Sequence, residues 1–336
     1  MLSPLQAGEI LMSWTRAQLG ELFALAESGA LTPSELDAAA AEAPLAPPRG
    51  EWLAAADRLC AFGGALLVMA GLIFFFAWNW AELHRFAKLA AAFAALAGCV
   101  GVALPSTPFG TVWRAALFGA CLALGALLAL IGQIYQSGAD VWELFAAWAA
   151  LMLPFALLAR SAGAWALWLV VANAALLRAL SESVLFRFLG ALDGPTPVLV
   201  VAGFNLIVLV GFEAFGGLLL AGGRRDLQRL AGLGVIGPLA LGAAIAWWEP
   251  RFLPLAPAYA VVAALAAWGY LVPRRDVAML ALTVFSAIAV AGSGLARVLP
   301  ERASFLTLNL LALFVIVTSA LAAMWLTRLT RETRRT

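Results

Sequence analysis

A run of apolar segments, each long enough to cross a membrane, constrains this chain more than any other feature. The segments begin near Leu59 and continue almost to the last residue. About ten spans of roughly 20 residues would leave only short loops and one N-terminal segment outside the bilayer. The sequence therefore predicts an all-α polytopic transmembrane helical bundle of about ten helices.

The residue composition favours the same class of protein. Hydrophobic residues make up 64% of the chain and charged residues only 12%, which is about half the charge of a typical soluble domain. The 21 basic and 19 acidic residues leave a net charge of +2, so nucleic acid is not an expected partner. The expected partner is the lipid bilayer. We expect spans at residues 59–78, 86–104, 111–131, 141–158, 162–180, 198–220, 230–248, 255–272, 277–298 and 304–326.

A small cytoplasmic helical hairpin is predicted ahead of the spans, at residues 1–42. Its second helix begins at Thr32, whose hydroxyl forms a capping box with Glu35, and Pro33 fits the first helical position. A proline-rich linker at 43–50 follows, then the bundle at 51–328 and a basic cytoplasmic tail at 329–336. The hairpin is either an amphipathic anchor on the membrane or bundle, or a module that binds a partner protein.

The distribution of basic residues predicts how the bundle is oriented. With a cytoplasmic N-terminus, fourteen of the 21 basic residues fall on the inner side, including clusters at 224–229, at 274–275 and in the tail. This asymmetry agrees with an even number of spans. We therefore expect both termini to be cytoplasmic.

The densest group of polar residues lies at the outer ends of the first four spans in this orientation. Its members are Asn79, His84, Lys88, Gln133, Tyr135, Asp140 and Glu143. The amides of Asn79 and Gln133 must find hydrogen-bond partners if they lie below the lipid headgroups. Two interpretations remain open. The nearby Trp and Tyr side chains are interfacial anchors, or the group forms an outward-facing polar pocket with Lys88 and Glu143 as opposite charges across it.

Glu213 lies well inside the predicted sixth span. A charge at such a depth costs a few kcal/mol unless it is paired, hydrated or neutralised. Glu213 is therefore a candidate intramembrane proton site, and the alternative is a protonated carboxyl group hydrogen-bonded to a neighbouring helix. Asn173, Asn205 and Asn309 are further mid-span polar residues, which could be its partners and are more typical of contacts between helices.

Enzyme chemistry has little support in the residues. His84 is the only histidine, and no two of the three cysteines form a C-x-x-C pair, so neither a metal site nor a disulfide framework is predicted. No P-loop, dinucleotide-binding or hydrolase motif occurs. We expect no enzymatic activity and no cofactor. The one catalytic alternative is a lipid-modifying enzyme that uses His84 with Asp140 or Glu143 as acid and base.

Two membrane segments and one N-terminal segment resemble a known family. They are residues 73–89, IFFFAWNWAELHRFAKL, residues 131–161, IGQIYQSGADVWELFAAWAALMLPFALLARS, and residues 25–38, LAESGALTPSELDA. They are similar to the bacterial predicted membrane-protein family known as domain of unknown function 2157. The resemblance implies a bacterial inner-membrane protein without an assigned activity, and no catalytic residue carries over from it. Where the family pattern tends to place His after the tyrosine of the third span, this chain has Gln136.

Two functions fit these observations. The first is a transporter or lipid-handling protein with an outward-facing polar pocket, which we favour. The second is a non-catalytic membrane scaffold or sensor component that docks a partner through its N-terminal hairpin. A continuous cavity joining Asn79, Lys88, Gln133 and Glu143 would favour the first, whereas a filled bundle would favour the second.

Overall fold

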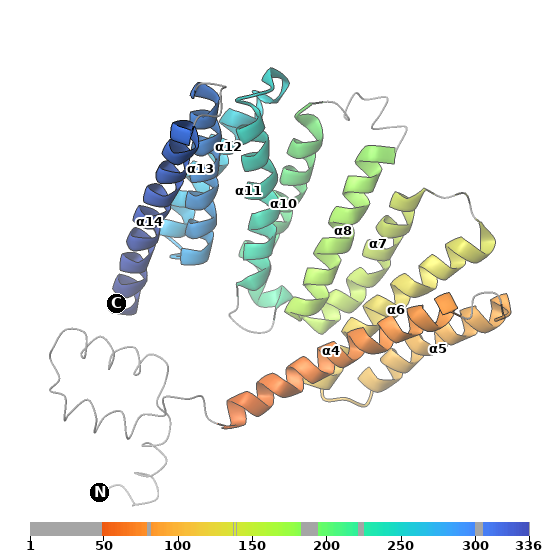
Figure 1. The fold of residues 1–336 in the computed structure, drawn as a ribbon. Coiled ribbons are helices and arrows are strands. Elements are labelled where there is room, and N and C mark those ends of the chain that lie inside the picture. Colours follow the sequence, from red (N-terminus) through yellow and green to blue (C-terminus); the bar gives the residue numbers. More distant parts are fainter. Residues whose placement is uncertain are drawn as a thin grey trace, which may run out of the picture. The chain divides into compact units, whose positions relative to one another are not determined.

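The computed structural model describes residues 49–78, 82–136, 138, 140–182, 194–220, 225–299 and 305–335. Its helices, drawn in Figure 1, are α4 (Arg49–Trp78), α5 (Arg85–Ala103), α6 (Thr111–Tyr135), α7 (Val141–Ala159), α8 (Ala162–Glu182), α10 (Thr196–Leu219), α11 (Asp226–Ile245), α12 (Leu255–Leu271), α13 (Val277–Val298) and α14 (Phe305–Arg335), with a short 3-10 helix at Pro250–Phe252. Within the described residues nine helices are long and apolar enough to cross a membrane, and α12 is a shorter apolar helix. The all-α transmembrane class is confirmed. The hairpin predicted at 1–42 lies outside the described residues.

The helices agree closely with the spans predicted from hydropathy, and the exceptions lie at the two ends of the series. The helix α13 occupies the predicted residues 277–298. In contrast, α4 begins at Arg49, before its apolar stretch, and α14 continues to Arg335. Hydropathy marks the part of a helix that lies in the bilayer, and residues of good helix propensity continue the same helix into water.

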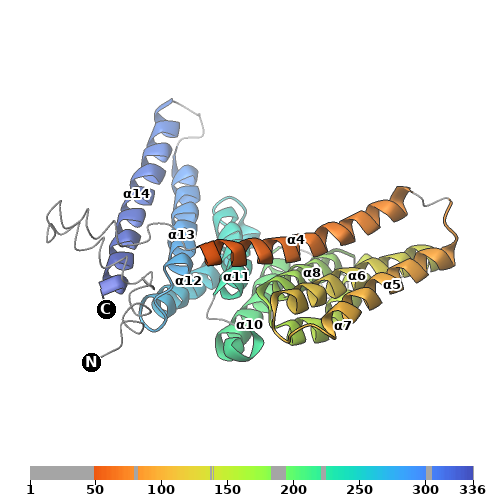
Figure 2. The same cartoon turned by 90° about the horizontal axis from the view of Figure 1, so that it is seen from below.

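The chain divides into two compact units, one of residues 57–322 and one that combines residues 1–56 with 323–336. In the larger unit α5, α6, α7 and α8 pack each against the next, as Figures 1 and 2 show. The helix α11 packs against α10, α12 and α13. The helix α8 contacts α6 on one side and α10 and α11 on the other, so it joins these two groups of helices.

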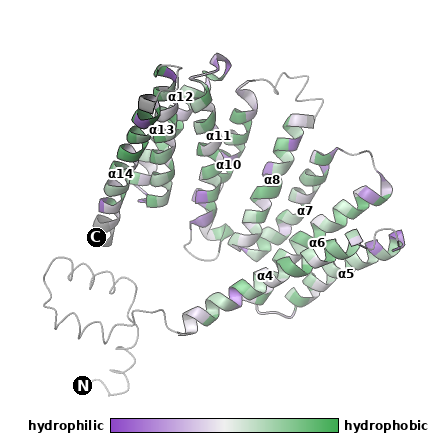
Figure 3. Ribbon diagram, viewed as in Figure 1, coloured by the Kyte–Doolittle hydropathy of each residue, from purple (hydrophilic) through white to green (hydrophobic). Residues whose placement is uncertain are grey.

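The core of the larger unit follows α6 and α11. About half of the apolar stretch of each is buried, 56% and 50%, compared with 11% for α4 and 6% for α14. Cys121 of α6 and Met152 of α7 are completely buried where α6, α7 and α8 meet. Figure 3 shows hydrophobic residues along the length of most helices, as a lipid environment requires.

Small residues set how closely the helices approach. A Cβ atom added at Gly125 of α6 would lie 2.4 Å from the ring of Trp148 on α7, and the same indole donates a hydrogen bond of 2.8 Å to the Cys121 carbonyl. In α4, however, Gly63 and Gly64 have nothing within 4 Å of the added atom. The helix α4 therefore packs less tightly on its neighbours than α6 packs on α7, which leaves room for cavities.

Candidate functional site

The turn between α6 and α7 brings part of the predicted outer group together. The helix α6 ends at Tyr135, whose side chain is exposed, and Gln136 reverses the chain with a φ of 43°. A pocket of about 480 Å³ lies between the two helices, and its lining includes Gln133, Asp140 and Glu143. Asp140 precedes α7 and Glu143 lies in its first turn, where the helix dipole favours negative charge. We call this the polar pocket.

The remaining members of the predicted group lie on α5 or outside the described residues. Asn79 is outside them. His84 is the N-cap of α5, where its Nδ1 accepts a hydrogen bond of 3.4 Å from the Phe86 backbone N–H. Lys88 follows one turn later and is buried, with 5% of its surface exposed. Because Glu143 is exposed, its pairing with Lys88 across a pocket stays a prediction.

An apolar cavity beside α4 adjoins the polar pocket. It has a volume of about 830 Å³ and lies between α4, α6 and α7, with Phe76 and Trp148 among its lining residues. Ala129, Gln133 and Leu144 line both this cavity and the polar pocket. Together these two adjoining spaces, which we call the α4 cavity, are amphipathic: the part beside α4 is apolar, and the part between α6 and α7 carries the carboxylates of Asp140 and Glu143.

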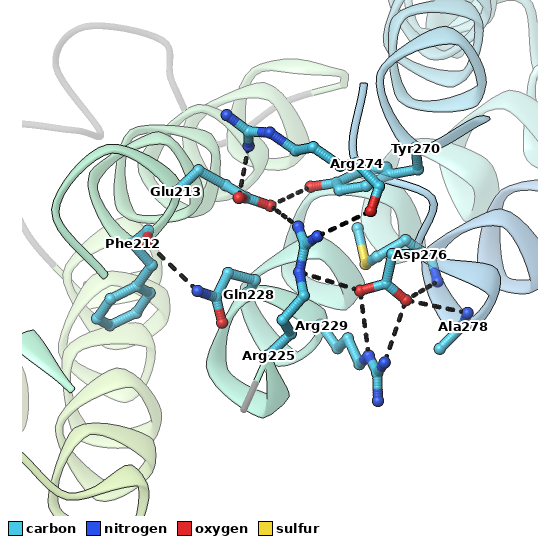
Figure 4. Close-up of polar contacts among 10 residues, drawn as sticks. Phe212, Glu213, Arg225, Gln228, Arg229, Tyr270, Arg274, Asp276 and Ala278 are labelled. Atoms are coloured by element: carbon cyan, nitrogen blue, oxygen red, sulfur yellow. Dashed lines mark hydrogen bonds and ion pairs between the residues drawn. The ribbon is translucent and has the colours of Figure 1, made fainter. Parts of the chain in front are cut away.

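A second polar group surrounds Glu213, as Figure 4 shows. Arg225 Nη2 donates to Glu213 Oε1 at 2.5 Å, and the Tyr270 hydroxyl donates to the same oxygen at 3.1 Å. Arg274 Nη1 lies 2.5 Å from Oε2, and the Arg274 carbonyl accepts a hydrogen bond of 3.3 Å from Arg225 Nη1. One carboxylate of α10 is thus joined to guanidinium groups from the start of α11 and from the turn after α12.

Asp276 is the second acid of this group. It is the N-cap of α13, and its Oδ1 accepts hydrogen bonds from backbone N–H groups of that helix, including Ala278 at 3.1 Å. The same carboxylate lies 3.2 Å from Arg225 Nε and 3.2 Å from Arg229 Nη2. The Asp276 side chain is 1% exposed and that of Glu213 is 12% exposed. We call Glu213, Arg225, Arg229, Arg274 and Asp276 the arginine network. Such burial of two acids is tolerable because opposite charges surround them.

The end of α10 is bent and held by neighbouring helices. Phe215 departs from helical geometry with φ −115° and ψ 15°. Arg160, which follows α7, donates a 2.6 Å hydrogen bond to the Gly217 carbonyl, and Trp165 of α8 donates a 3.0 Å bond to the Leu219 carbonyl. The helix α7 therefore begins at the polar pocket and ends beside the helix end that carries Glu213. The polar pocket and the arginine network lie at opposite ends of α7.

The surroundings of Glu213 could be read only in part from the sequence. Its partners are arginines and a tyrosine, whereas Asn173 and Asn205 bond to each other at 2.7 Å and 3.2 Å. The proton-site interpretation of Glu213 stays a prediction. Sequence reasoning missed Asp276 and the role of Arg274 beside it. The available signal was the pair of arginine clusters, which we used for orientation alone.

The part of the chain that the structure describes contains no candidate metal site. No group of three or more His, Cys, Asp or Glu residues comes close enough together there to hold an ion. The three cysteines are free, and they range from exposed Cys60 to buried Cys121.

Comparison with known proteins agrees with the resemblance noted above. Residues 24–165 match the model of the family described as predicted membrane protein (DUF2157). This match confirms the resemblance from residue 24, within the predicted hairpin sequence, through α4 to α7 and the polar pocket, and it ends before Glu213. No curated protein and no protein of solved structure matches the chain.

Proposed function

We propose that this protein is a non-enzymatic lipid-handling protein that takes a bilayer amphiphile with an ammonium group in its headgroup into the α4 cavity. The observation that carries the proposal is that the 830 Å³ apolar cavity and the 480 Å³ polar pocket adjoin and share Ala129, Gln133 and Leu144 in their linings. The apolar part suits an acyl chain, and the carboxylates of Asp140 and Glu143 suit an ammonium group.

The headgroup must supply most of the selectivity at this site. An acyl chain that moves from the bilayer into an apolar cavity leaves one hydrocarbon environment for another, so the hydrophobic effect gives little net gain. Asp140 and Glu143 line one pocket, and two neighbouring carboxylates favour a cation between them because it relieves their mutual repulsion. Because α4 packs loosely on its neighbours, the acyl chain of a lipid could enter the cavity laterally from the bilayer.

The proposal includes an orientation and a membrane. The arginine network faces the cytoplasm by the positive-inside rule, so the polar pocket opens on the outer face. In the bacterial inner membrane suggested by the family resemblance, both termini are then cytoplasmic. A bilayer amphiphile with an ammonium headgroup would reach the polar pocket from the outer leaflet.

Native mass spectrometry of the full chain in detergent tests the lipid site. Phosphatidylethanolamine is the probe because its ammonium group carries three N–H donors. Ala129→Phe fills the α4 cavity, and Ala150→Phe adds the same ring at an exposed position of α7. We expect Ala129→Phe, but not Ala150→Phe, to weaken binding. The double change Asp140→Asn with Glu143→Gln should weaken it about tenfold or more, since charged hydrogen bonds are lost.

Phosphatidylglycerol with the same acyl chains is measured in parallel, and its binding should be unchanged by these variants. If Ala129→Phe and Ala150→Phe bind phosphatidylethanolamine equally well, the lipid does not occupy the α4 cavity. Binding that survives loss of both carboxylates would remove the headgroup site. Either result would leave the scaffold function ahead.

A further inference from the structure

A different cavity meets the arginine network at the other end of the bundle. It has a volume of about 340 Å³, lies between α10, α11, α12 and α13, and is lined by apolar side chains such as Leu206, Ile236 and Val262. Tyr270 and Arg274 also line it. From Tyr270 to Val262 along α12, the helical rise gives the cavity a length of about 12 Å. It is apolar at depth and basic at its mouth.

The arginine network, which lies at the mouth of this cavity, carries a net positive charge. Three guanidinium groups of the arginine network surround two carboxylates. The acids are buried, whereas the Arg274 side chain is 43% exposed, so the network presents its positive groups outward. Among the described residues, the Arg274 guanidinium contacts a carboxylate through Nη1 alone, although an arginine carries five N–H donors. Asp226 and Arg275 flank the network in sequence and balance each other in charge.

The cavity is also accessible from the bilayer. Leu265 and Trp268 line it and are exposed, at 61% and 64% of their surfaces, so its side faces lipid in a membrane. The surrounding leaflet is therefore the source of an occupant, and that occupant must match a basic mouth. An acyl chain fits the apolar part, and a phosphate group complements the guanidinium of Arg274.

We propose that the cavity between α10 and α13 binds an anionic phospholipid, with one acyl chain inside it and the headgroup phosphate on Arg274. The site shares no lining residue with the α4 cavity, so it does not depend on the proposed function above. Glu213 holds Arg274 through Oε2, and the Tyr270 hydroxyl donates a hydrogen bond to the other carboxylate oxygen of Glu213. Such a lipid would add a negative charge beside a network of three guanidinium groups and two carboxylates.

The test measures phosphatidylglycerol and phosphatidylcholine, with the same acyl chains, binding to the full chain by native mass spectrometry in detergent. Ala266→Phe places a ring in the cavity lining, and Ala264→Phe places the same ring at an exposed position of α12 outside that lining. Arg274→Gln removes the charge at the mouth, and Arg297→Gln removes one beside Trp248, away from the network. Ala266→Phe leaves the network intact, so the test does not depend on Arg274→Gln folding well.

Both lipids carry a phosphate, but phosphatidylcholine adds a trimethylammonium group that the net positive charge of the arginine network disfavours. We therefore expect the wild-type chain to bind phosphatidylglycerol about tenfold more tightly than phosphatidylcholine. Ala266→Phe and Arg274→Gln should abolish that preference, and Ala264→Phe and Arg297→Gln should retain it. Equal binding of the two lipids by the wild-type chain would overturn the proposal, as would a preference that survives in Ala266→Phe. Oleate is a third probe. If it binds through Arg274 in place of phosphatidylglycerol, the site takes a fatty carboxylate and the phospholipid assignment is wrong.

Discussion

Replacing Asp276 with Asn removes one charge from the arginine network while it preserves the cap of α13. The lost carboxylate is 1% exposed, but its partners Arg225 and Arg229 are 25% and 45% exposed. Breaking a fully buried pair costs about 3–5 kcal/mol, and an exposed pair contributes at most about 1 kcal/mol. Because water can solvate the two arginines in part, we expect Asp276→Asn to lower the free energy of unfolding by about 2 kcal/mol.

A second substitution at the same position separates the charge from the cap. Asn accepts hydrogen bonds from the first turn of a helix nearly as well as Asp, whereas Ala cannot. Asp276→Ala should therefore cost about 1 kcal/mol more than Asp276→Asn. The backbone N–H groups of Ala278 and Met279, at 3.1 Å and 3.3 Å from Oδ1, are the donors that lose their acceptor.

Circular dichroism follows unfolding in mixed micelles as the fraction of dodecyl sulfate is increased. This titration measures how much Asp276→Asn and Asp276→Ala each lower the free energy of unfolding. Glu249→Gln is the control, because Glu249 pairs with Arg251 at 3.6 Å and both side chains are about half exposed or more, at 47% and 63%. It should change stability by less than about 0.5 kcal/mol. If Asp276→Asn costs no more than Glu249→Gln, the network does not stabilise the fold. If Asp276→Ala and Asp276→Asn lower the free energy of unfolding by the same amount, the capping argument fails.

Two further predictions concern the packing of helices. Gly125→Leu should destabilise the chain by about 2 kcal/mol or more, because the added side chain meets the Trp148 ring, whereas Gly203→Leu, where nothing lies within 4 Å, should be tolerated; the same micelle titration compares them. Asn205→Leu should cost about 1 kcal/mol by leaving Asn173 without its 2.7 Å partner, and the double variant with Asn173→Leu should recover part of that loss in the titration. A double variant as unstable as the sum of the single ones would contradict this.

Most of the fold could be predicted because hydropathy has a direct physical cause. A helix that crosses a bilayer must be apolar over about 20 residues and must satisfy its own backbone, so the bounds of α13 were readable from residues 277–298 alone. The ends of α4 and α14 were not, since a helix can continue in water without an apolar signal. The association of α11 with α10, α12 and α13 also leaves no local pattern in the chain.

The candidate sites divide in the same way. Gln133, Asp140 and Glu143 are close in sequence, so one turn between helices was enough to bring them into one pocket. The arginine network needs Glu213 on α10 and Asp276 before α13, separated by two further helices. No spacing rule relates such positions. A charged residue inside an apolar span did indicate that a partner had to exist, but not which residue it was.

The charges of the two proposed lipid sites argue against a single path through the bundle. As proposed, the carboxylates of Asp140 and Glu143 would select an ammonium group beside α7, whereas Arg274 would select a phosphate beside α12. A headgroup moving from one site to the other would lose its favourable contacts and meet like charge. The helix α8, which contacts α6, α10 and α11, also stands between the two groups of helices. Each cavity is therefore best suited to exchange lipid with the leaflet beside it, and loss of one site by cavity filling should leave binding at the other intact.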